Sequence, residues 1–563
     1  METLSNLKTQ SWLSWFLRGI LCLGFLALFA RIFDLQIIRG SYFRTLADEN
    51  RIRKVTISAP RGEILARGGE VLVGNREVKK SVQFDEESGY KKVEATEVSG
   101  NEGLLSEWIR DYKLGATLGH VSGYVGEVNE EELGKIKGEC PEKGPRKIGS
   151  YVGRTGLEEM YECVLSGTDG EELIEVDARG TAIRVLGIRE PIPGENIRTT
   201  IDIGLQKKIA QTMSGKKGAA IATDKKGEIL AFFSSPSYDP NIFADKKLSD
   251  NLYHVLNDIN KPLFNRVMGG LFHPGSVYKP VVAIAALEEG KIDKDFTYDD
   301  TGQIFIESIY GDYSYKNWYF TQYGGTEGKI DLTRAIARST DTFFYKVGEL
   351  TGVENLVSWS EKFGLNQKTG IDLPGEISGL VPNPNWKLQE KGERWFLGNT
   401  YHMSIGQGDL AVTPIEINRE ISAISNGGKL CKPRLVKADG SEKEDCSEIG
   451  IKRENIDLVM EGMKGGCSEG GTAYTFFNFK EKSGVEVACK TGTAQTESGE
   501  PHAWFTVFAP ANEDASKPEI VLTLLVENGG EGSKVAGPIA REIMDYWYNV
   551  PISPTVTPTG SFQ

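Results

Sequence analysis

The sequence predicts an α+β protein that begins with a single apolar helix, continues as a strand-rich domain and ends as a larger mixed domain. The run from Trp12 to Phe33 is nearly all apolar, and about 20 such residues cross a bilayer as a helix. Residues 74–150 are polar and punctuated by glycine, and a strand-rich stretch follows Leu165 up to about Thr200. The rest mixes helical patterns with a late cluster of strands, and 563 residues suffice for two or three domains.

The apolar run is interpreted as an uncleaved membrane anchor. Arg18 lies inside it but can extend its side chain to the interface, and Trp12 and Trp15 suit a membrane boundary. A cleaved signal peptide is the alternative, but no A-x-A-like site follows the run. We expect a cytoplasmic tail at residues 1–11, a transmembrane helix at 12–33 and the bulk of the chain outside the cell membrane.

Residues 40–200 are expected to form the strand-rich domain. A helix at Ser41–Arg53 leads into a strand at Lys54–Ser58, and an amphipathic helix is expected from Gly153 to Leu165. The Glu/Lys runs of residues 74–150 favour a solvated surface over a binding site.

The second domain is expected at residues 205–550. Gly218–Phe233 has two apolar runs around a Lys-Lys-Gly turn, which is a hairpin pattern. The remaining elements are helices at Asp202–Met213, Pro280–Glu289, Thr342–Leu350 and Gly537–Tyr548, and strands at Val485–Cys489, Ala503–Ala509 and Ile520–Val526. Residues 551–563 are rich in Pro, Thr and Ser and predict a disordered tail.

Composition excludes some functions. A net charge of −14 argues against a nucleic-acid partner, because phosphate binding needs concentrated Lys and Arg. The seven cysteines form no C-x-x-C pair and accompany no His cluster, so we expect no zinc site, and no other metal or cofactor. An odd number cannot pair completely within the chain. Cys431 and Cys446 could bridge, but buried free thiols are favoured.

Ser276-Val-Tyr-Lys279 is the candidate nucleophile motif. A Pro-Gly turn precedes Ser276 and an apolar helix follows it, so backbone N–H groups at the helix start can stabilise an oxyanion. Lys279 shares a helix face with Ser276 and can reach its hydroxyl. Burial lowers the pKa of a lysine, and a neutral amine can take the serine proton. Other Ser-x-x-Lys matches, at Ser5, Ser88 and Ser214, lie in polar or terminal segments and are interpreted as surface features.

Two more motifs follow in order. Ser339-Thr-Asp341 is expected in a loop between two helices, where a capping role is the default interpretation. Lys490-Thr-Gly-Thr493 is expected at the end of a strand, where Gly492 permits close backbone approach and Lys490 with the threonine hydroxyls can bind a carboxylate. The second Lys-Thr-Gly, at Lys368, has no strand before it and is interpreted as a turn.

The three motifs together resemble the triplet of the penicillin-recognising serine acyltransferases, S-x-x-K, S-x-N/D and K-T/S-G. The chain is most similar to class B penicillin-binding proteins, which are membrane-anchored D,D-transpeptidases, and to the elongation enzymes more than the septal ones. Further matches that cover most of the chain are Asp48–Arg53, Ala59–Gly62, Gly153–Glu158, Ser235–Asn241 and Ser404–Gly408. The resemblance implies an elongated pedestal domain and a β-lactamase-like transpeptidase domain, whose antiparallel sheet is flanked by helices.

The resemblance also implies roles for the motif residues. Ser276 would be acylated and Lys279 would be its base. Ser339 would relay a proton to the leaving amine, with electrostatic help from Lys490. Asp341 stands where many members of the family have Asn, and its charge would raise the pKa of Lys279 and oppose its action as a base. Lys490 would act in the opposite direction, so which lysine is neutral is left open.

Substrate binding is assigned in the same way. Thr491 and Thr493 would hold the terminal carboxylate of a donor stem peptide ending in D-Ala-D-Ala, beside Gly492. The backbone N–H groups of Ser276 and Thr493 would form the oxyanion hole. The chain departs from the family at Ala66, where Asp is usual, and part of the pedestal between residues 74 and 150 looks short.

The leading hypothesis is therefore a peptidoglycan D,D-transpeptidase of the bacterial cell membrane that β-lactams inhibit covalently. A β-lactamase or D,D-carboxypeptidase would use the same triplet, but would not need an anchor and a pedestal. A non-catalytic β-lactam sensor or scaffold is the third hypothesis, against which the intact triplet argues. The resemblance implies a membrane glycosyltransferase of the SEDS type as partner.

Overall fold

The structure is a computed structural model that describes residues 12–551, apart from short interruptions. The interruptions are 86–88, 95–103, 137–139, 144–145, 177–181, 246–247, 249, 308–310, 438–444, 498, 513–515 and 518. The predicted tail at residues 1–11, the predicted tail beyond residue 551, and the motif matches at Ser5 and Ser88 lie outside the described residues.

The chain divides into two compact units. The first contains residues 1–60, 77–108 and 167–193, and the second contains residues 61–76, 109–166 and 194–563. The strand-rich segment therefore contributes to both units, because its chain passes between them several times.

The first unit begins with the predicted apolar helix. Helix α1 (Trp12–Phe33) has the expected bounds, is apolar and long enough to cross a membrane, and buries no side chain. Helix α2 (Gly40–Arg51) leads into β1 (Ile52–Ile57), as the sequence predicts. Strand β1 pairs with β8 (Gly170–Val176), and β8 pairs with β9 (Ala182–Arg189), to form an antiparallel sheet in the order β1-β8-β9.

The remaining strands that the structure describes before residue 200 are short, apart from β3 (Val71–Asp85) and β5 (Leu104–Tyr112). Strand β3 (Val71–Asp85) pairs with β4 (Gly89–Glu94) and with β5 (Leu104–Tyr112). The other strands are β2 (Ile64–Leu65), β6 (Val125–Glu127), β7 (Tyr151–Gly153) and β10 (Ile197–Arg198).

The helix predicted from Gly153 to Leu165 is broken in the structure. Gly153 pairs with Val125 in a strand, and the helical residues fall into α5 (Gly156–Met160) and α6 (Glu162–Leu165). Between them Tyr161 leaves helical geometry and its hydroxyl donates to Asp372, 3.1 Å away. Tertiary contacts thus override the helical periodicity at both points.

A buried carboxylate ties the motif segments of this region together. Glu158 is fully buried and accepts hydrogen bonds from Arg61 at 3.0 Å and from Arg110 at 2.5 Å. Arg61 also donates to Glu162 at 2.7 Å. Burial raises the pKa of Glu158, but Arg110 and Arg61 outweigh it and the net shift is downward. Arg61 of the Pro-Arg-Gly turn and Glu158 of the Gly-Arg-Thr-Gly segment are therefore ion-pair partners.

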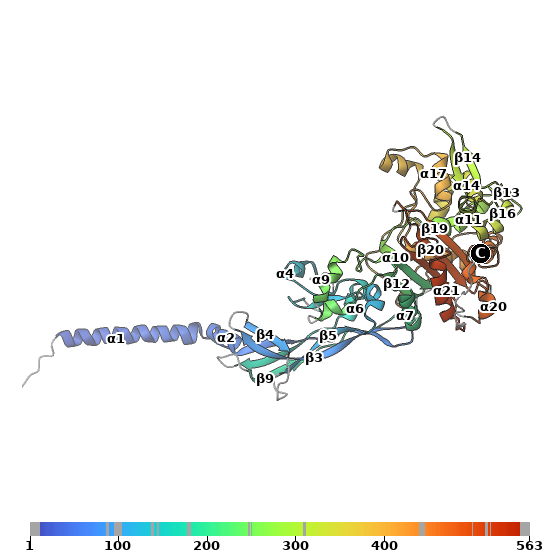
Figure 1. The fold of residues 1–563 in the computed structure, drawn as a ribbon. Coiled ribbons are helices and arrows are strands. Elements are labelled where there is room, and N and C mark those ends of the chain that lie inside the picture. Colours follow the sequence, from blue (N-terminus) through green and yellow to red (C-terminus); the bar gives the residue numbers. More distant parts are fainter. Residues whose placement is uncertain are drawn as a thin grey trace, which may run out of the picture. The chain divides into compact units, whose positions relative to one another are not determined.

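A five-stranded antiparallel sheet forms the centre of the second unit, in the order β12-β11-β21-β20-β19. The strands are β11 (Gly218–Thr223), β12 (Ile229–Ser235), β19 (Ala488–Ala494), β20 (His502–Ala509) and β21 (Ile520–Val526). The predicted hairpin at 218–233 is confirmed. The strand expected at Val485–Cys489 begins later, at Ala488, and includes the whole Lys-Thr-Gly motif. Figure 1 shows the sheet from β12 in green to β19 and β20 in orange.

Both faces of this sheet are covered by helices. Alternate residues of β11 enter two different cores, Ala219 with Ile221 on one face and Ala220 with Ala222 on the other. The first core includes α11 and α18, and the second includes α7 and α21 beside the sheet (Figure 1). The helices used below are α7 (Ile203–Thr212), α11 (Lys279–Glu288), α12 (Trp318–Tyr323), α13 (Leu332–Arg338), α14 (Asp341–Thr351), α18 (Pro414–Ser425), α19 (Arg453–Gly466) and α21 (Ala536–Trp547).

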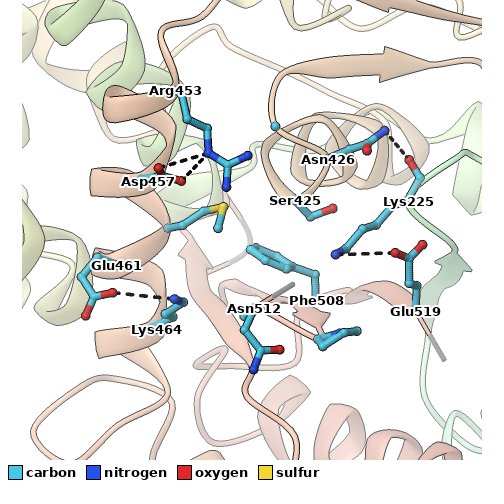
Figure 2. A pocket seen from close by; sticks show the side chains of 14 residues that line it. Lys225, Ser425, Asn426, Arg453, Asp457, Glu461, Lys464, Phe508, Asn512 and Glu519 are labelled. Carbon is cyan, nitrogen blue, oxygen red and sulfur yellow. Dashed lines mark hydrogen bonds and ion pairs between the residues drawn. The ribbon is translucent and has the colours of Figure 1, made fainter. Parts of the chain in front are cut away.

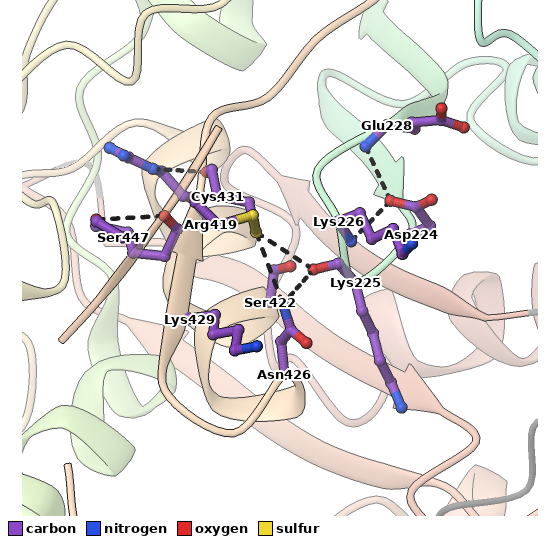
Figure 3. Close-up of a disulfide and its surroundings, with 12 residues drawn as sticks. Asp224, Lys225, Lys226, Glu228, Arg419, Ser422, Asn426, Lys429, Cys431 and Ser447 are labelled. Atoms are coloured by element: carbon purple, nitrogen blue, oxygen red, sulfur yellow. Dashed lines mark hydrogen bonds between the residues drawn. A yellow bond between two sulfur atoms is a disulfide. The ribbon is translucent and has the colours of Figure 1, made fainter. Parts of the chain in front are cut away.

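The expectation of buried free thiols is wrong, because three disulfides pair six cysteines. They are Cys140–Cys163, Cys431–Cys446 and Cys467–Cys489, while Cys22 is free. Their Cα atoms lie 5.3, 3.9 and 5.6 Å apart, a proximity that sequence spacing does not reveal. Figure 3 shows Cys431, whose carbonyl accepts from Arg419 at 3.0 Å.

Candidate active site

Ser276 lies in a tight turn that leads into a buried helix. The 3₁₀ turn Gly275–Tyr278 runs directly into α11, and Pro280 stands in the first turn of that helix, as expected. Gly275 donates its backbone N–H to the carbonyl of Gly406 at 2.8 Å. Its φ of +58° suits glycine, and a Cβ there would lie 3.0 Å from the Thr493 carbonyl oxygen.

The Lys-Thr-Gly strand approaches that turn closely. Strand β19 is an edge strand, and a Cβ on Gly492 would lie 2.9 Å from Cβ of Trp504 and 3.0 Å from Cγ1 of Val277. Only glycine fits between β20 and the turn that carries Ser276. The predicted close backbone approach at Gly492 is therefore confirmed.

Ser339 occupies the connection between two helices, as predicted. It follows the last residue of α13, and Asp341 is the first residue of α14. Ser339 has a left-handed backbone with φ of +57°, which is unusual for a residue with a Cβ and is often found at functional sites. This geometry turns its side chain and its carbonyl toward the two motif lysines.

Both motif lysines contact Ser339. Lys279 Nζ donates to the Ser339 carbonyl at 2.8 Å and lies 3.3 Å from Ser339 Oγ. Lys490 Nζ donates to Ser339 Oγ at 2.9 Å and to the Thr491 carbonyl at 3.0 Å. Both lysines and Ser339 are buried, so one hydroxyl connects the two amines in a medium of low polarity.

Asp341 pairs with Lys279 rather than with Lys490. Its Oδ1 lies 2.7 Å from Lys279 Nζ, and its Oδ2 accepts the backbone N–H of Trp318 at 2.9 Å. The side chain therefore joins Lys279 to the start of α12 and does not cap its own helix. The default capping interpretation of this motif does not describe Asp341.

The two lysines differ in the neighbouring charges that act on their pKa in addition to burial. Burial lowers the pKa of Lys279, and the neighbouring Asp341 carboxylate counteracts part of that effect. Burial lowers the pKa of Lys490 well below its ordinary value, the positive charge of Lys279 lowers it further, and Asp341 opposes both. Lys490 is therefore the lysine for which the neutral form is more strongly favoured in this structure.

Ser276 itself is half-buried, and its hydroxyl has no hydrogen-bond partner among the described residues. Lys279 directs its three hydrogen bonds to Ser339 and Asp341, so the expected bond from Lys279 to Ser276 is not formed here. Hydrogen bonds of this kind are often long in the absence of substrate. The Ser276 hydroxyl is thus open to an incoming group.

The threonines of the third motif differ in exposure. Thr491 is buried and its hydroxyl lies 2.9 Å from that of Thr472. Thr493 is exposed and its hydroxyl accepts the backbone N–H of Gly532 at 3.2 Å. Thr472 escaped the sequence reasoning, although the Gly470-Gly-Thr run that contains it was a detectable turn signal.

The competing motif copies lie elsewhere. Ser214 and Lys217 are exposed in a turn after α7. Lys368-Thr-Gly370 forms no strand, and the Glu376 carboxylate accepts the N–H groups of Thr369 at 2.8 Å and Gly370 at 3.0 Å. The Ser214 copy is thus a surface feature and the Lys368 copy lies outside any strand, in agreement with both interpretations.

A separate hollow of about 560 Å³ lies between the ends of α18 and β20 and helix α19 (Figure 2). Its walls carry the ion pairs Lys225–Glu519, Arg453–Asp457 and Lys464–Glu461, at 3.7, 2.8 and 3.8 Å. None of the predicted site residues lines it. Each of these cations is already paired with a carboxylate, so the hollow does not select for an anionic substrate.

Comparison with known proteins gives the same assignment as the motifs. A family model described as the penicillin binding protein transpeptidase domain matches residues 218–545, and one described as the penicillin-binding protein dimerisation domain matches residues 92–199. The peptidoglycan D,D-transpeptidase MrdA of Haemophilus influenzae is 31% identical over 97% of this chain and 94% of its own length. The chain belongs to the class B penicillin-binding proteins and is a serine-type transpeptidase of that family.

Solved structures place it more narrowly. Penicillin-binding protein 2 of Helicobacter pylori, solved in complex with MreC, is 27% identical, with a TM-score of 0.73 over 88% of this chain and 98% of that one. A chain of a peptidoglycan synthase complex that coordinates polymerization and crosslinking is 28% identical, with a TM-score of 0.75 over 96% of this chain and 99% of that one. Among the class B proteins, this chain is therefore similar to penicillin-binding protein 2.

The pH dependence of acylation tests the role of Asp341. Asp341→Asn keeps an oxygen for the N–H of Trp318 but removes the charge that favours the ammonium form of Lys279. The pKa of Lys279 should fall, so acylation by a penicillin should reach half its maximal rate at a pH lower by about one unit. Coincident profiles for the variant and the wild type would show that Asp341 does not tune the base.

Proposed function

We propose that this chain is a peptidoglycan D,D-transpeptidase that cross-links stem peptides during cell elongation and is inhibited covalently by β-lactams. The observation that carries the proposal is the convergence of the three motifs on one hydroxyl. Ser339 Oγ lies 3.3 Å from Nζ of Lys279, which follows Ser276 in the same motif, and 2.9 Å from Lys490 Nζ. This arrangement supplies a nucleophile, a base and a proton relay.

The proposed reaction has two stages. Ser276 Oγ attacks the carbonyl carbon between the two terminal D-alanines, and its proton passes to Lys279. The tetrahedral intermediate then breaks the peptide bond and releases D-alanine, whose amine takes a proton relayed through Ser339. An amine of a second stem peptide attacks the resulting ester, forms a new peptide bond and frees Ser276.

The contacts of Lys279 are compatible with its proposed role as base. A neutral amine has two N–H bonds, which can keep the hydrogen bonds to Asp341 at 2.7 Å and to the Ser339 carbonyl at 2.8 Å. The longest of the three contacts, 3.3 Å to Ser339 Oγ, is then given up. The nitrogen lone pair becomes available for the proton of Ser276.

The third motif is the proposed site for the donor carboxylate. Thr493 is the exposed residue of β19, and Lys490, Thr491 and Gly492 precede it on the same edge strand. Hydroxyl groups and a lysine amine on an edge strand can donate hydrogen bonds to a carboxylate. The N–H groups of Ser276 and Thr493 are proposed to hold the developing oxyanion, and losing one such donor typically costs about 10²–10³ in rate.

Labelling with a fluorescent penicillin tests this function. The full chain in detergent should form a stable covalent adduct. The amine that leaves when the β-lactam ring opens stays attached to the acyl group, so it does not diffuse away. Ser276→Ala should not label, whereas Ser214→Ala, in the exposed motif copy, should label normally. An unlabelled wild type would refute the acyl-enzyme, and rapid loss of label would indicate a β-lactamase. Cross-linking of wall precursor then separates a transpeptidase from a sensor.

We further propose a single-pass topology, with residues 1–11 in the cytoplasm and the catalytic domain outside the membrane. We assign residues 40–200 to the pedestal and 205–550 to the transpeptidase domain. The cysteines support this topology, since Cys22 in α1 is free and the six that follow are paired. Disulfides form in oxidising compartments and are rare in the cytosol.

Alkylation of the full chain tests the pairing of the cysteines and, through it, the proposed external location. Cells are denatured in excess maleimide without reductant, and the intact mass of the purified chain is determined. One adduct, at Cys22, is expected, with seven after prior reduction. Seven adducts without reduction would contradict both the pairing and the external location.

A membrane glycosyltransferase of the SEDS type is the proposed partner, in keeping with the polymerization-and-crosslinking complex noted above. Strand β9 offers a suitable surface in the first unit. It is an edge strand of the β1-β8-β9 sheet, and its apolar residues Ile183, Val185, Leu186 and Ile188 are exposed.

Copurification tests this surface. Val185→Lys should reduce recovery of the glycosyltransferase while penicillin labelling stays unchanged, because a charge would be placed in an apolar contact. Arg189→Lys, on the same strand, is the control that preserves charge. Equal recovery with all three proteins would exclude β9 from the contact.

A further inference from the structure

Asp300 lies outside all three motifs, yet it is the buried carboxylate on which the surroundings of Asp341 converge. It ends β13 (Thr297–Asp300), which pairs with β16 (Gly328–Asp331), and only 1% of its surface is exposed. A buried carboxylate needs hydrogen-bond donors. The donors that Asp300 uses come from four separate places in the chain.

Each oxygen of Asp300 accepts two hydrogen bonds. Oδ1 accepts from the N–H of Gly302 at 2.9 Å and from the hydroxyl of Thr342 at 2.6 Å. Oδ2 accepts from Nδ2 of Asn317 at 3.1 Å and from the N–H of Glu327 at 2.9 Å. Three of these partners adjoin the middle motif.

Asn317 and Thr342 connect Asp300 to Asp341. Thr342 is the neighbour of Asp341 in α14. Asn317 uses its Nδ2 on Asp300 and its Oδ1 to accept the backbone N–H of Asp341 at 3.1 Å. Asn317 immediately precedes Trp318, whose N–H binds Oδ2 of Asp341 at 2.9 Å. Asp300 thus fixes both the backbone and the carboxylate of Asp341.

Glu327 extends the same network to the other side of Ser339. Its backbone is bound to Asp300, and its carboxylate accepts from Arg338 Nε at 2.6 Å. The Arg338 carbonyl in turn accepts from the indole of Trp318 at 3.0 Å. Residues on both sides of Ser339 are therefore held by groups that Asp300 orders.

We propose that Asp300 is a positioning residue for transpeptidation, which holds Asp341 against Lys279 and thereby sets the protonation of the catalytic lysine. This inference rests on the proposed function, because it concerns the acylation of Ser276. Asp300 does not touch the reacting atoms. Its effect passes through Asn317 and Thr342.

The charged groups around this chain of contacts include the ion pair of Glu327 and Arg338, whose atoms lie 2.6 Å apart. Two charged groups face Lys279 of α11. They are Asp341, which belongs to α14, and Lys490, which belongs to β19. Asp341 also faces Tyr345 of its own helix, and Asp300 faces Tyr298 of its own strand. Both tyrosines have a pKa raised by burial, so neither becomes charged near neutral pH. A shift in the acylation profile near neutral pH therefore reports on the two lysines.

Asp300→Asn is a sharp probe because the side chain keeps its shape. An amide has one acceptor and one donor group, and backbone N–H groups face both oxygens of Asp300. In either orientation of the new amide, its NH₂ group therefore faces a backbone N–H, and the hydrogen bond at that position is lost. The matched control is Asp299→Asn, on the exposed face of the same strand.

The measurement is the second-order rate constant for acylation of the full chain by a fluorescent penicillin across pH. Asp300→Asn should lower the maximal constant by about 10-fold and move the pH of half-maximal rate downward by about one unit, while Asp299→Asn should match the wild type. If Asp300→Asn keeps the wild-type pH profile, the proposal is overturned, whatever its maximal rate constant. A purely structural defect reduces the amount of active enzyme without moving the profile.

Thr342→Val covers the case in which Asp300→Asn does not fold. It removes one hydrogen bond to Asp300 and preserves volume, so a smaller shift in the same direction is expected. An unshifted profile there would equally overturn the proposal. If the wild type itself fails to label at Ser276, the proposed function fails. If it labels and the Asp300 and Thr342 variants are unshifted, only this inference fails.

Discussion

The charge balance between two buried lysines and one carboxylate is the constraint on which the site depends. Lys279 and Lys490 both contact Ser339 Oγ, and Asp341 pairs with Lys279 alone. Two ammonium groups this close in a buried site repel each other, and one carboxylate offsets only one of them. The site is therefore most stable when one amine is neutral, and Lys490, which burial and the positive charge of Lys279 both affect, is the one for which the neutral form is more strongly favoured.

Backbone geometry brings the three motifs close enough for this balance to exist. Ser339 lies between α13 and α14 with a left-handed backbone, and the glycines at 275 and 492 let the turn that carries Ser276 approach the edge strand β19. Each position is one where an ordinary residue would be strained or would collide. Because the motif lysines come from a helix and a strand, neither can adjust freely, and Ser339 meets both.

Two further features restrain the residues of the site, a disulfide and a buried hydrogen-bond network. The disulfide Cys467–Cys489 joins the residue after α19 to β19, one residue before Lys490. Asp300 gathers the segment between β13 and β16 against the middle motif. A covalent link therefore restrains the strand that carries one lysine, and a buried hydrogen-bond network orders the carboxylate that pairs with the other. Such preorganisation keeps charged groups in place without solvent rearrangement.

The sequence by itself determined the elements and the chemistry that local patterns encode. Helix α1, the β11–β12 hairpin and strand β21 have the predicted positions, because apolar periodicity reflects burial directly. The motif triplet also distinguished Ser276 and Lys490 from their other copies, and the family it resembled is confirmed. Local context was sufficient there, because a serine at a helix start and a lysine on a strand leave short-range signatures.

Only the tertiary structure decided which groups meet. It broke the helix expected at 153–165, paired cysteines that the sequence left as thiols, and assigned Asp341 to Lys279 rather than to Lys490. It also revealed Asp300 and Thr472, which belong to no motif. Pairing across hundreds of residues depends on distances in space, and residue spacing does not encode them when each partner comes from a different element.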